Sequence, residues 1–309
     1  MASGVISQKR IRSLYRIRTA DIVFAAISVL IALITVYPMW YVICMSISTP
    51  SAVVRGNITL WPDAFLLDSY KVICSDTALW HSLLMSLFYV VVGLMIMLTS
   101  CMLMAFPLTR PNLIGRKFVV FFLLIPMYFS GGMIPTFILK AKTLNLYDTV
   151  WAIILPGISI WNIILCRTFL ASIPQDISEA AYIDGASNTK VLTKIFIPLS
   201  KPVIAVISIY TIVGIWNSWF DSRLYQTNVE LHPAQMYLQR VLIQQSVNLS
   251  ELVQEGASED TIESAVEMAN RSYQLKYALI VLVTLPIVMV YPMFQKYFVK
   301  GVMLGSLKG

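Results

Sequence analysis

The chain has 309 residues, of which 58% are hydrophobic and only 13% charged, with a formal net charge of +7 and a mean hydropathy of +0.74. These values exclude an ordinary soluble globular domain. The cysteines (Cys44, Cys74, Cys101, Cys166) form no CxxC pair and the two histidines lie far apart, which excludes a disulfide framework and argues against a metal site or a metalloenzyme.

Six windows of at least 18 residues contain no Asp, Glu, Lys or Arg: 22–54, 77–109, 118–139, 149–166, 202–220 and 277–295. A helix that crosses the ~30 Å hydrocarbon core of a bilayer needs about 20 mostly apolar residues. The windows therefore predict an all-α, multi-pass membrane protein with six transmembrane helices. They form one transmembrane domain over 22–299, because no internal repeat or low-complexity linker divides it.

The basic residues are concentrated in every second connecting segment. With the N-terminus inside, the segments 1–21, 107–117, 167–201 and 296–309 contain 15 of the 23 Lys and Arg and 4 of the 16 acidic residues. The positive-inside rule then places both termini in the cytoplasm. We interpret the basic segment 1–21 as a determinant of topology rather than as a nucleic-acid or lipid site, and 300–309 as a cytoplasmic tail.

The connections differ in character along the chain. Residues 48–76 predict an irregular outer loop, and Leu108 to Lys117 a short inner turn. Ser130-Gly131-Gly132 with Pro135 interrupts the third span, and Pro156-Gly157 disturbs the fourth; such breaks occur where backbone meets protein or a water-filled cavity. The outer loop 223–274 contains an acidic stretch that predicts a short helix starting near Ser258.

Several function classes lack their usual signals. The sequence has no G-x-x-x-x-G-K-[ST] loop, so we expect no ATP binding or hydrolysis by this chain. No carboxylate or basic residue lies at mid-depth in a window, which argues against a proton-driven carrier. A sodium-coupled secondary carrier is disfavoured, because backbone carbonyls at broken helices could still bind the ion. A membrane-embedded enzyme would need a cluster of His, Asp or Cys that is absent.

The segment 171–202 is polar and rich in small residues, although it lies between two apolar windows. Ser172-Ile173-Pro174-Gln175 predicts a helix start, Gly185 a bend, and Ser187 or Asn188 the cap of a second short helix. The small residues Ala180, Ala181, Gly185 and Ala186 would let another backbone approach, with Glu179 and Asp184 as acceptors beside them. The residues alone leave open whether this element enters a partner's groove or lies on the bilayer surface.

A family resemblance rests on this segment. Glu179-Ala180-Ala181, Asp184-Gly185-Ala186, Ile195 and Pro198-Leu199 stand in the order and spacing of the EAA loop of permeases from binding-protein-dependent ABC importers. Leu192 stands where such loops often have Phe. YFSGGMIPTFIL (128–139), WNSWFD (216–221) and the ending YPMFQKYFVKGVMLGSLKG (291–309) resemble a branch of carbohydrate-uptake permeases. That branch serves aldouronate, oligosaccharide and polysaccharide binding lipoproteins, and the chain is similar to its maltose-G-like subunit.

The resemblance implies a type I ABC importer permease in a bacterial plasma membrane. Its partners would be a second homologous permease, two ATPase subunits that hold ATP and Mg, and an extracellular solute-binding lipoprotein. The chain itself would bind no cofactor and would move an oligosaccharide or polysaccharide-derived sugar. The coupling loop 171–202 would dock on the ATPase through Glu179, Ala180, Ala181, Asp184, Gly185, Ala186, Ile195 and Pro198. Alternatives are a permease for a non-sugar solute and a stand-alone secondary carrier.

Sugar contacts need aromatic faces together with amide and hydroxyl groups. Candidates for the substrate pathway are Tyr37, Tyr128, Trp161, Asn162, Trp216, Asn217 and Trp219. The alternative for the aromatic members is an interfacial belt. In the outer loop, the resemblance implies a contact with the binding protein, for which Tyr225, His232, Gln235 and Tyr237 are candidates. An ordinary surface loop is the alternative there.

Overall fold

The computed structural model describes residues 19–129, 131–155, 158–242 and 259–306, and every regular element in these ranges is a helix. The all-α prediction is confirmed. Most of the basic segment 1–21, the Pro156-Gly157 pair, Ser130 and residues 307–309 of the tail lie outside the described residues, so the predictions made for them are not compared with the structure.

Three helical stretches are long and apolar enough to cross a bilayer on their own. They are α2 (Thr19–Ile47), α5 (Thr77–Thr109) and the part Ser272–Tyr297 of α16 (Glu259–Ser306). Within the described ranges the number rises to five if each of two bent helix pairs counts as one span. The count of six spans and the cytoplasmic position of the termini therefore stay predictions.

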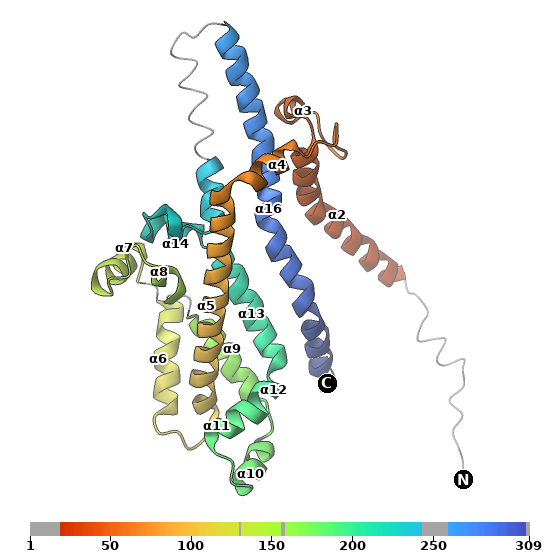
Figure 1. Cartoon of the computed structure of the whole chain (residues 1–309). Coiled ribbons are helices and arrows are strands. Elements are labelled where there is room, and N and C mark those ends of the chain that lie inside the picture. The colour runs from red at the N-terminus through yellow and green to blue at the C-terminus, as the bar shows by residue number, and fades with distance from the viewer. Residues whose placement is uncertain (1–18, 130, 156–157, 243–258, 307–309) are drawn as a thin grey trace.

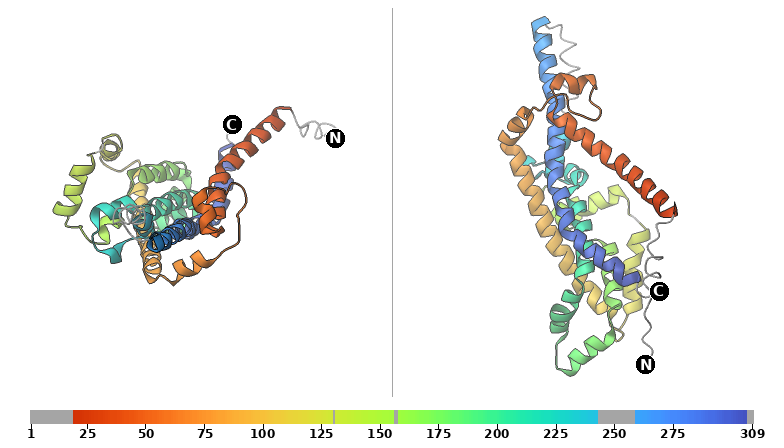
Figure 2. Two further views of the ribbon diagram at one scale, coloured as in Figure 1. Left: turned by 90° about the horizontal axis from the view of Figure 1, so that it is seen from above. Right: turned by 90° about the vertical axis from the view of Figure 1, so that its right-hand side faces the viewer.

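Helix α5 forms the centre of the bundle and packs against α9 (Ile160–Ala171) and α13 (Lys201–Trp216) (Figures 1 and 2). Gly93 lies on the face of α5 that meets α13. A Cβ atom at this position would lie 2.4 Å from Cδ1 of Ile215, the far end of a flexible side chain. A larger residue would therefore require the Ile215 side chain to change its rotamer.

Helix α16 is much longer than the sequence predicts. It begins at Glu259, next to the predicted start near Ser258, but it is not a short acidic helix: it continues for 48 residues to Ser306. It packs against α2 and α13, and Nε2 of Gln274 donates to the carbonyl oxygen of Ser48 at 2.6 Å. The predicted boundary between outer loop and last span at residue 274 therefore falls inside one helix.

The predicted irregular outer loop 48–76 contains two short helices, α3 (Pro50–Arg55) and α4 (Asp68–Ser75). Pro50 at the first position of α3 has a backbone angle suited to a helix start, and Asp68 places negative charge at the N-terminus of α4. The connection between them is held by Nε1 of Trp40, which donates to the carbonyl oxygen of Leu60 at 2.7 Å. The loop is thus more ordered than its prolines suggest.

Neither the third nor the fourth window forms one unbroken helix in the described residues. Helix α6 (Arg116–Tyr128) ends at the extended residue Phe129, and α7 (Met133–Ile138) continues into the π-helical turn η1 (Leu139–Thr143). The window 149–166 contains α8 (Trp151–Ile154) and α9, separated by the non-helical Ser159, so no single helix fills it. Beyond α13 follow α14 (Trp219–Tyr225) and the 3₁₀ turn η4 (Val229–Leu231).

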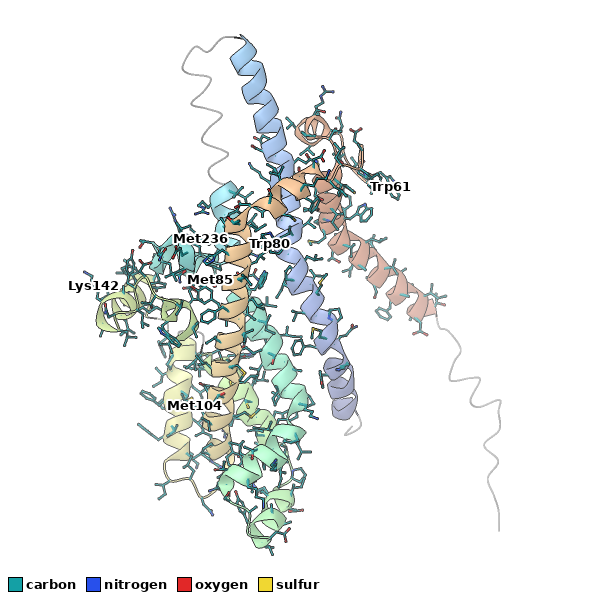
Figure 3. The ribbon with its side chains drawn as sticks, in the orientation of Figure 1. Trp61, Trp80, Met85, Met104, Lys142 and Met236 are labelled. Atoms are coloured by element: carbon teal, nitrogen blue, oxygen red, sulfur yellow. The ribbon has the colours of Figure 1, made fainter. Side chains whose placement is uncertain are left out.

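Large apolar surfaces remain uncovered on this chain. No residue in the most apolar 18-residue window of α2 is buried, and α6 has no buried residue at all. Helix α2 diverges from the rest of the bundle (Figure 1). Trp61, next to the end of α2, and Lys142 lie on opposite sides of the whole molecule (Figure 3). Surfaces of this extent are stable only against lipid or another subunit.

Candidate functional site

The segment 171–202 folds as two short helices joined at Gly185. Helix α10 (Gln175–Ile183) ends with Gly185 at a φ of +76°, in the left-handed region. Its end has the Schellman pattern: the N–H of Ala186 donates to the carbonyl of Ala181 at 2.9 Å, and that of Gly185 to the carbonyl of Tyr182 at 3.0 Å. The predicted bend at Gly185 is confirmed, and its cause is a helix C-cap that glycine adopts without strain.

The second half of the segment begins with the predicted cap. The Ser187 hydroxyl accepts a hydrogen bond from the backbone N–H of Lys190, and α11 (Asn188–Val191), the π-helical turn η3 (Leu192–Phe196) and α12 (Ile197–Leu199) follow. The predicted Ser172 cap of α10 is wrong. The Ser172 hydroxyl donates to the carbonyl of Phe169, and α10 starts after Pro174 without a side-chain cap.

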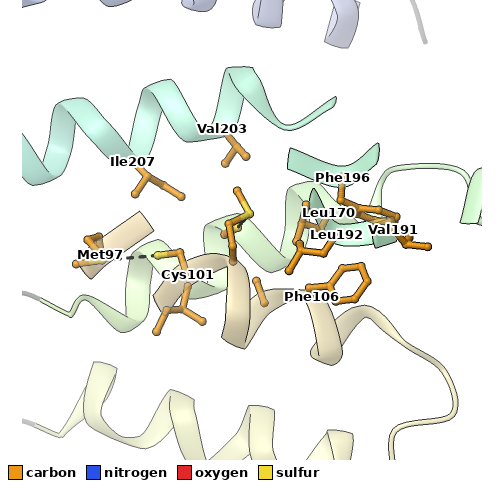
Figure 4. Packing of buried hydrophobic residues seen from close by; sticks show 13 residues of the cluster. Met97, Cys101, Phe106, Leu170, Val191, Leu192, Phe196, Val203 and Ile207 are labelled. Atoms are coloured by element: carbon orange, nitrogen blue, oxygen red, sulfur yellow. Dashed lines mark hydrogen bonds between the residues drawn. The ribbon is translucent and has the colours of Figure 1, made fainter. Parts of the chain in front are cut away.

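The segment has one face toward the bundle and one face away from it. Val191, Leu192 and Phe196 are buried in a cluster with α5, α9 and α13 (Figure 4), and Ala181, Ala186 and Ile195 pack against this cluster. Ala181 and Ala186 are therefore half-buried within their own chain, and a contact of these two residues with a partner stays a prediction. Glu179, Ala180, Asp184, Gly185 and Pro198 are exposed.

The exposed face contains a large apolar side chain that the sequence analysis did not single out. Ile183, the last residue of α10, is 87% exposed. It stands directly before Asp184 and Gly185, at the bend between the two short helices. Because this isoleucine is almost wholly exposed, it contributes little to the stability of its own chain. It is therefore a candidate anchor for a partner surface. Its signal in the sequence is an apolar residue directly before the C-cap.

Arg110 ties the segment to the end of α5. Its guanidinium carbon lies 4.3 Å from the ring centroid of Phe106, 5.0 Å from that of Phe196 and 5.6 Å from that of Tyr182. Its Nη1 also donates to the Ser178 hydroxyl at 3.1 Å. One side chain thus contacts α5, α10 and η3 through cation–π and hydrogen-bond interactions.

A cavity of about 540 Å³ lies between α9, α13 and the turn after α7. Two of the predicted pathway residues, Trp161 and Asn162, line it. Nζ of Lys140 and Oδ1 of Asp221 lie 3.8 Å apart at this cavity. The buried Thr211 hydroxyl on its wall has no hydrogen-bond partner. The cavity therefore offers an aromatic face, an amide, a hydroxyl and a pair of opposite charges.

Residues 22–220 match the family described as binding-protein-dependent transport system inner membrane component. The chain belongs to this family. It is thus the membrane component of an ABC importer and not an enzyme, and membership implies an ATPase and a solute-binding protein as partners. The predicted family, multi-pass membrane location and non-enzymatic role are confirmed.

Similar proteins extend the match over nearly the whole permease. The polygalacturonan/rhamnogalacturonan transport system permease protein YtcP of Bacillus subtilis is 38% identical over 94% of this chain and 99% of its own. Protein LplC of the same organism is 39% identical over 89% of this chain and 90% of its own. A solved bacterial ABC transporter involved in the import of the acidic polysaccharide alginate aligns with a TM-score of 0.77 at 30% identity, over 91% of this chain and 99% of that one.

The permease does not bring all predicted pathway residues together. Trp216 is 5% exposed and its Nε1 donates to the carbonyl of Val283 at 3.3 Å, so it packs between α13 and α16. Asn217 is exposed and accepts from Nε2 of Gln235 at 3.4 Å. The remaining three are exposed away from the cavity lining: Tyr37 on α2, Tyr128 at the end of α6 and Trp219 on α14.

Lys140 and Asp221 are cavity residues that the sequence analysis missed. Each is the first charged residue after one of the apolar windows, 118–139 and 202–220. This position was a usable signal, since two charges at the ends of two spans can meet at the same depth. What the sequence does not give is that the break after Tyr128 turns Lys140 back toward α13.

Three of the four predicted binding-protein contacts have structural roles within the permease. Tyr225 is buried and stacks on Phe137 with ring centroids 5.6 Å apart. His232 is buried, and the Tyr237 hydroxyl donates to Asp76. Burial raises the pKa of Tyr237 to about 12. These side chains are not free to meet a partner in this conformation, which corrects the expectation; a contact through Gln235 stays a prediction.

We expect the loop around His232 to lose stability on acidification. Burial lowers the pKa of His232 below its usual 6.5, assisted by Arg240 and Arg223, while the bond to the Gln226 carbonyl and the charge of Asp148 act in the opposite direction. The unfolded loop then binds the proton first, so stability is full above pH 6.5 and falls below it, by at most about 1.4 kcal/mol per pH unit.

Hydrogen exchange of residues 225–240 between pH 7.5 and 5.5 measures this effect. His232→Gln can keep a donor toward the Gln226 carbonyl and does not titrate, so its exchange protection should not fall over this range. Equal loss of protection in both forms would contradict the assignment.

Proposed function

We propose that this chain is the permease subunit of an ATP-driven importer for an oligosaccharide or a polysaccharide-derived sugar. It would pair with a second, homologous permease, with two ATPase subunits that bind ATP and Mg, and with an extracellular solute-binding lipoprotein. The chain itself would bind no cofactor. The observation that carries the proposal is the exposed tip of the 171–202 element in a member of a binding-protein-dependent transport family.

The shape of this element supports a docking role. Its inner face is anchored by Val191, Leu192 and Phe196 in the core of the bundle, so a force on the tip reaches α5, α9 and α13. Its exposed residues include the carboxylates of Glu179 and Asp184 as well as Ile183. We propose that Glu179 pairs with a basic group of the ATPase and that Ile183 enters an apolar pocket there.

The uncovered apolar helices support a second permease. Helix α2 diverges from its own bundle, with its most apolar window wholly unburied (Figure 1). Polar contacts could not replace lipid along such a surface, whereas the helices of a homologous subunit could. We propose that α2 lies against the partner permease as well as against lipid.

The similar proteins and the cavity together support a sugar as the cargo. The relative YtcP is named for polygalacturonan and rhamnogalacturonan, and the solved transporter imports alginate. The Trp161 ring offers a surface on which sugar C–H groups stack, and Asn162 and Thr211 can bond sugar hydroxyls. Lys140 and Asp221 supply a cation and a carboxylate beside them, and both can bond sugar hydroxyls.

Co-purification and reconstituted uptake test the proposal. The tagged chain should isolate an ATPase and a second permease, and vesicles containing the complex and its binding protein should take up oligogalacturonides only with internal ATP and Mg. Uptake by the chain alone, driven by an ion gradient, would instead identify a secondary carrier. ATP-dependent uptake of a non-sugar solute would remove the cargo assignment and leave the importer assignment intact.

Trp161→Ala tests the cavity as part of the sugar pathway. Trp161 is 61% exposed, so the change should leave folding intact. Loss of one aromatic contact of about 0.5–1.5 kcal/mol should weaken the apparent sugar affinity in uptake roughly 2- to 12-fold. The control is Trp61→Ala, which removes an exposed tryptophan outside the cavity. Unchanged uptake kinetics in Trp161→Ala would rule out a pathway role for this residue.

A further inference from the structure

Three arginines line one pocket beside the 171–202 element. The pocket has a volume of about 820 Å³ and is enclosed by the α5–α6 turn, α9 and α10, with Arg110, Arg116 and Arg167 in its wall. Glu179 is the single carboxylate among its lining residues. The lining therefore has a formal charge of +2, from three positive charges and one negative charge, in a confined space that favours an anion.

The hydrogen bonds of these arginines leave most of their donors unused. Arg110 donates from Nη1 to Ser178, but its Nε and Nη2 are covered and have no partner. Nη1 of Arg116 and Nε of Arg167 donate to backbone carbonyls at 3.4 Å each. All these acceptors are neutral, and in the part of the chain that the structure describes none of the three pairs with a carboxylate. The donors of Arg116 and Arg167 that have no acceptor are open to an anionic oxygen, and the positive charge of Arg110 adds to the attraction.

A second, smaller hollow of about 250 Å³ adjoins this pocket and indicates what kind of anion fits. It shares Arg116 and Arg167 with the pocket and adds Lys117 and the apolar residues Val120, Phe121 and Leu124 of α6. Arg116 and Lys117 stand at the first turn of α6, Arg167 stands opposite them on α9, and an exposed apolar face of α6 follows directly. A cationic site continuous with an apolar stripe is the complement of a phosphate attached to an acyl chain.

We infer that this site binds an anionic glycerophospholipid from the bilayer leaflet that borders the α5–α6 turn. Its phosphate lies between Arg116 and Arg167, its headgroup extends toward the side of the pocket where Arg110 lies, and one acyl chain follows Val120, Phe121 and Leu124. A free phosphate would use the arginines but would leave the apolar hollow empty. A lipid uses both parts of the site.

The bound lipid would touch the element proposed to dock on the ATPase. Ser178, Glu179 and Tyr182 of α10 line the same pocket as the arginines. An anion there repels Glu179 and attracts Arg110, which holds Ser178 and Tyr182, so occupancy shifts the balance of forces on α10. This consequence for transport rests on the proposed function, whereas the binding itself does not.

Lipid retention by the full chain, purified with its co-purifying subunits, tests the binding. The probes are detergent micelles doped with phosphatidylglycerol or with phosphatidylcholine, and native mass spectrometry counts the bound lipids. We expect selective retention of phosphatidylglycerol. The double variant Arg116→Gln with Arg167→Gln should weaken it about 25-fold, since each basic group near a headgroup contributes about a fivefold factor.

The matched control is Lys190→Gln with Lys194→Gln, which removes two exposed cations of the neighbouring 171–202 element that lie outside the pocket. It should retain the lipid as the unaltered chain does. Equal retention of both lipids by the unaltered chain would overturn the inference without any variant. So would equal losses in the two double variants, or displacement of phosphatidylglycerol by millimolar inorganic phosphate, which would identify a free anion as the ligand.

A separate measurement tests the consequence for transport. Uptake should be faster in vesicles with phosphatidylglycerol than in pure phosphatidylcholine, and the arginine variant should lose this difference. Selective binding without any lipid effect on uptake would overturn the consequence but not the site. Absence of ATP-driven uptake in every lipid, with binding intact, would instead count against the proposed function.

Discussion

Ile183→Asp is expected to reduce ATP-driven uptake by about 30-fold or more while leaving the permease folded. Ile183 is 87% exposed at the end of α10, so the isolated chain loses almost no buried contact when it is changed. In the proposed complex the same side chain fills an apolar pocket of the ATPase. Placing a carboxylate there removes an interface anchor and buries a charge without a partner, each with an effect of about 2 kcal/mol or more.

Ile114→Asp is the matched control for this change. Ile114 is 97% exposed in the turn between α5 and α6, and it lies outside the 171–202 element. The two variants introduce the same carboxylate at equally exposed isoleucines. We expect Ile114→Asp to keep both uptake and co-purification of the ATPase, while Ile183→Asp loses both. Full uptake in Ile183→Asp would show that the tip does not dock.

Changes at neighbouring positions of the element would be less informative. Ala181 packs against the core cluster, so Ala181→Arg would disturb the bundle as well as any docking surface. A β-branched residue at Gly185 would be strained at its φ of +76°, although open space surrounds the position. A change at Ile183 tests docking without disturbing the fold, because this side chain makes almost no contact within its own chain.

Trp216→Ala should lower the stability of the permease by about 3–5 kcal/mol, the usual cost of emptying the space of a buried tryptophan. Trp216 lies in a cluster of α5, α8 and α13 side chains and bonds to the Val283 carbonyl of α16. Its removal therefore loosens the joint between α13 and α16. Thermal unfolding in detergent measures the loss, and Trp216→Phe should recover much of it by refilling the cavity.

Trp219→Ala is the control for this prediction. Trp219 stands three residues later on α14 and is 37% exposed against 5% for Trp216, so its loss should lower the unfolding temperature clearly less. If Trp216→Ala kept full thermal stability and lowered only the sugar affinity, Trp216 would be a pathway residue. That result would contradict the packing role seen here.

Local features were predictable because they depend on neighbouring residues alone. Gly185 and Ser187 fix the bend and the cap of the 171–202 element through bonds that span six residues or fewer. The break after Tyr128 follows from glycine and proline in the same way. The EAA spacing identified the family before any contact was known, because it depends on residue types and order.

The direction of each side chain was not predictable at the same level. The sequence predicts the same two roles for Trp216 and Trp219, a sugar contact or an interfacial belt. In the structure Trp216 is buried against α16, whereas Trp219 is exposed. The difference arises from where α16 crosses α13, which is a long-range contact. Likewise, the contact between Lys140 and Asp221 depends on the direction in which the chain turns after α7. The three rings around the Arg110 guanidinium come from three separate elements, α5, α10 and η3.

The unbroken length of α16 has a mechanical consequence. From Glu259 to Pro286 the helix measures about 40 Å, at about 1.5 Å per residue. Pro286 and Pro292 each remove a backbone hydrogen bond, so flexing is easiest there. A tilt of one degree at this joint displaces the far tip of the helix by about 0.7 Å, so a bend of a few degrees near Pro286 moves the Glu259 end by several ångströms.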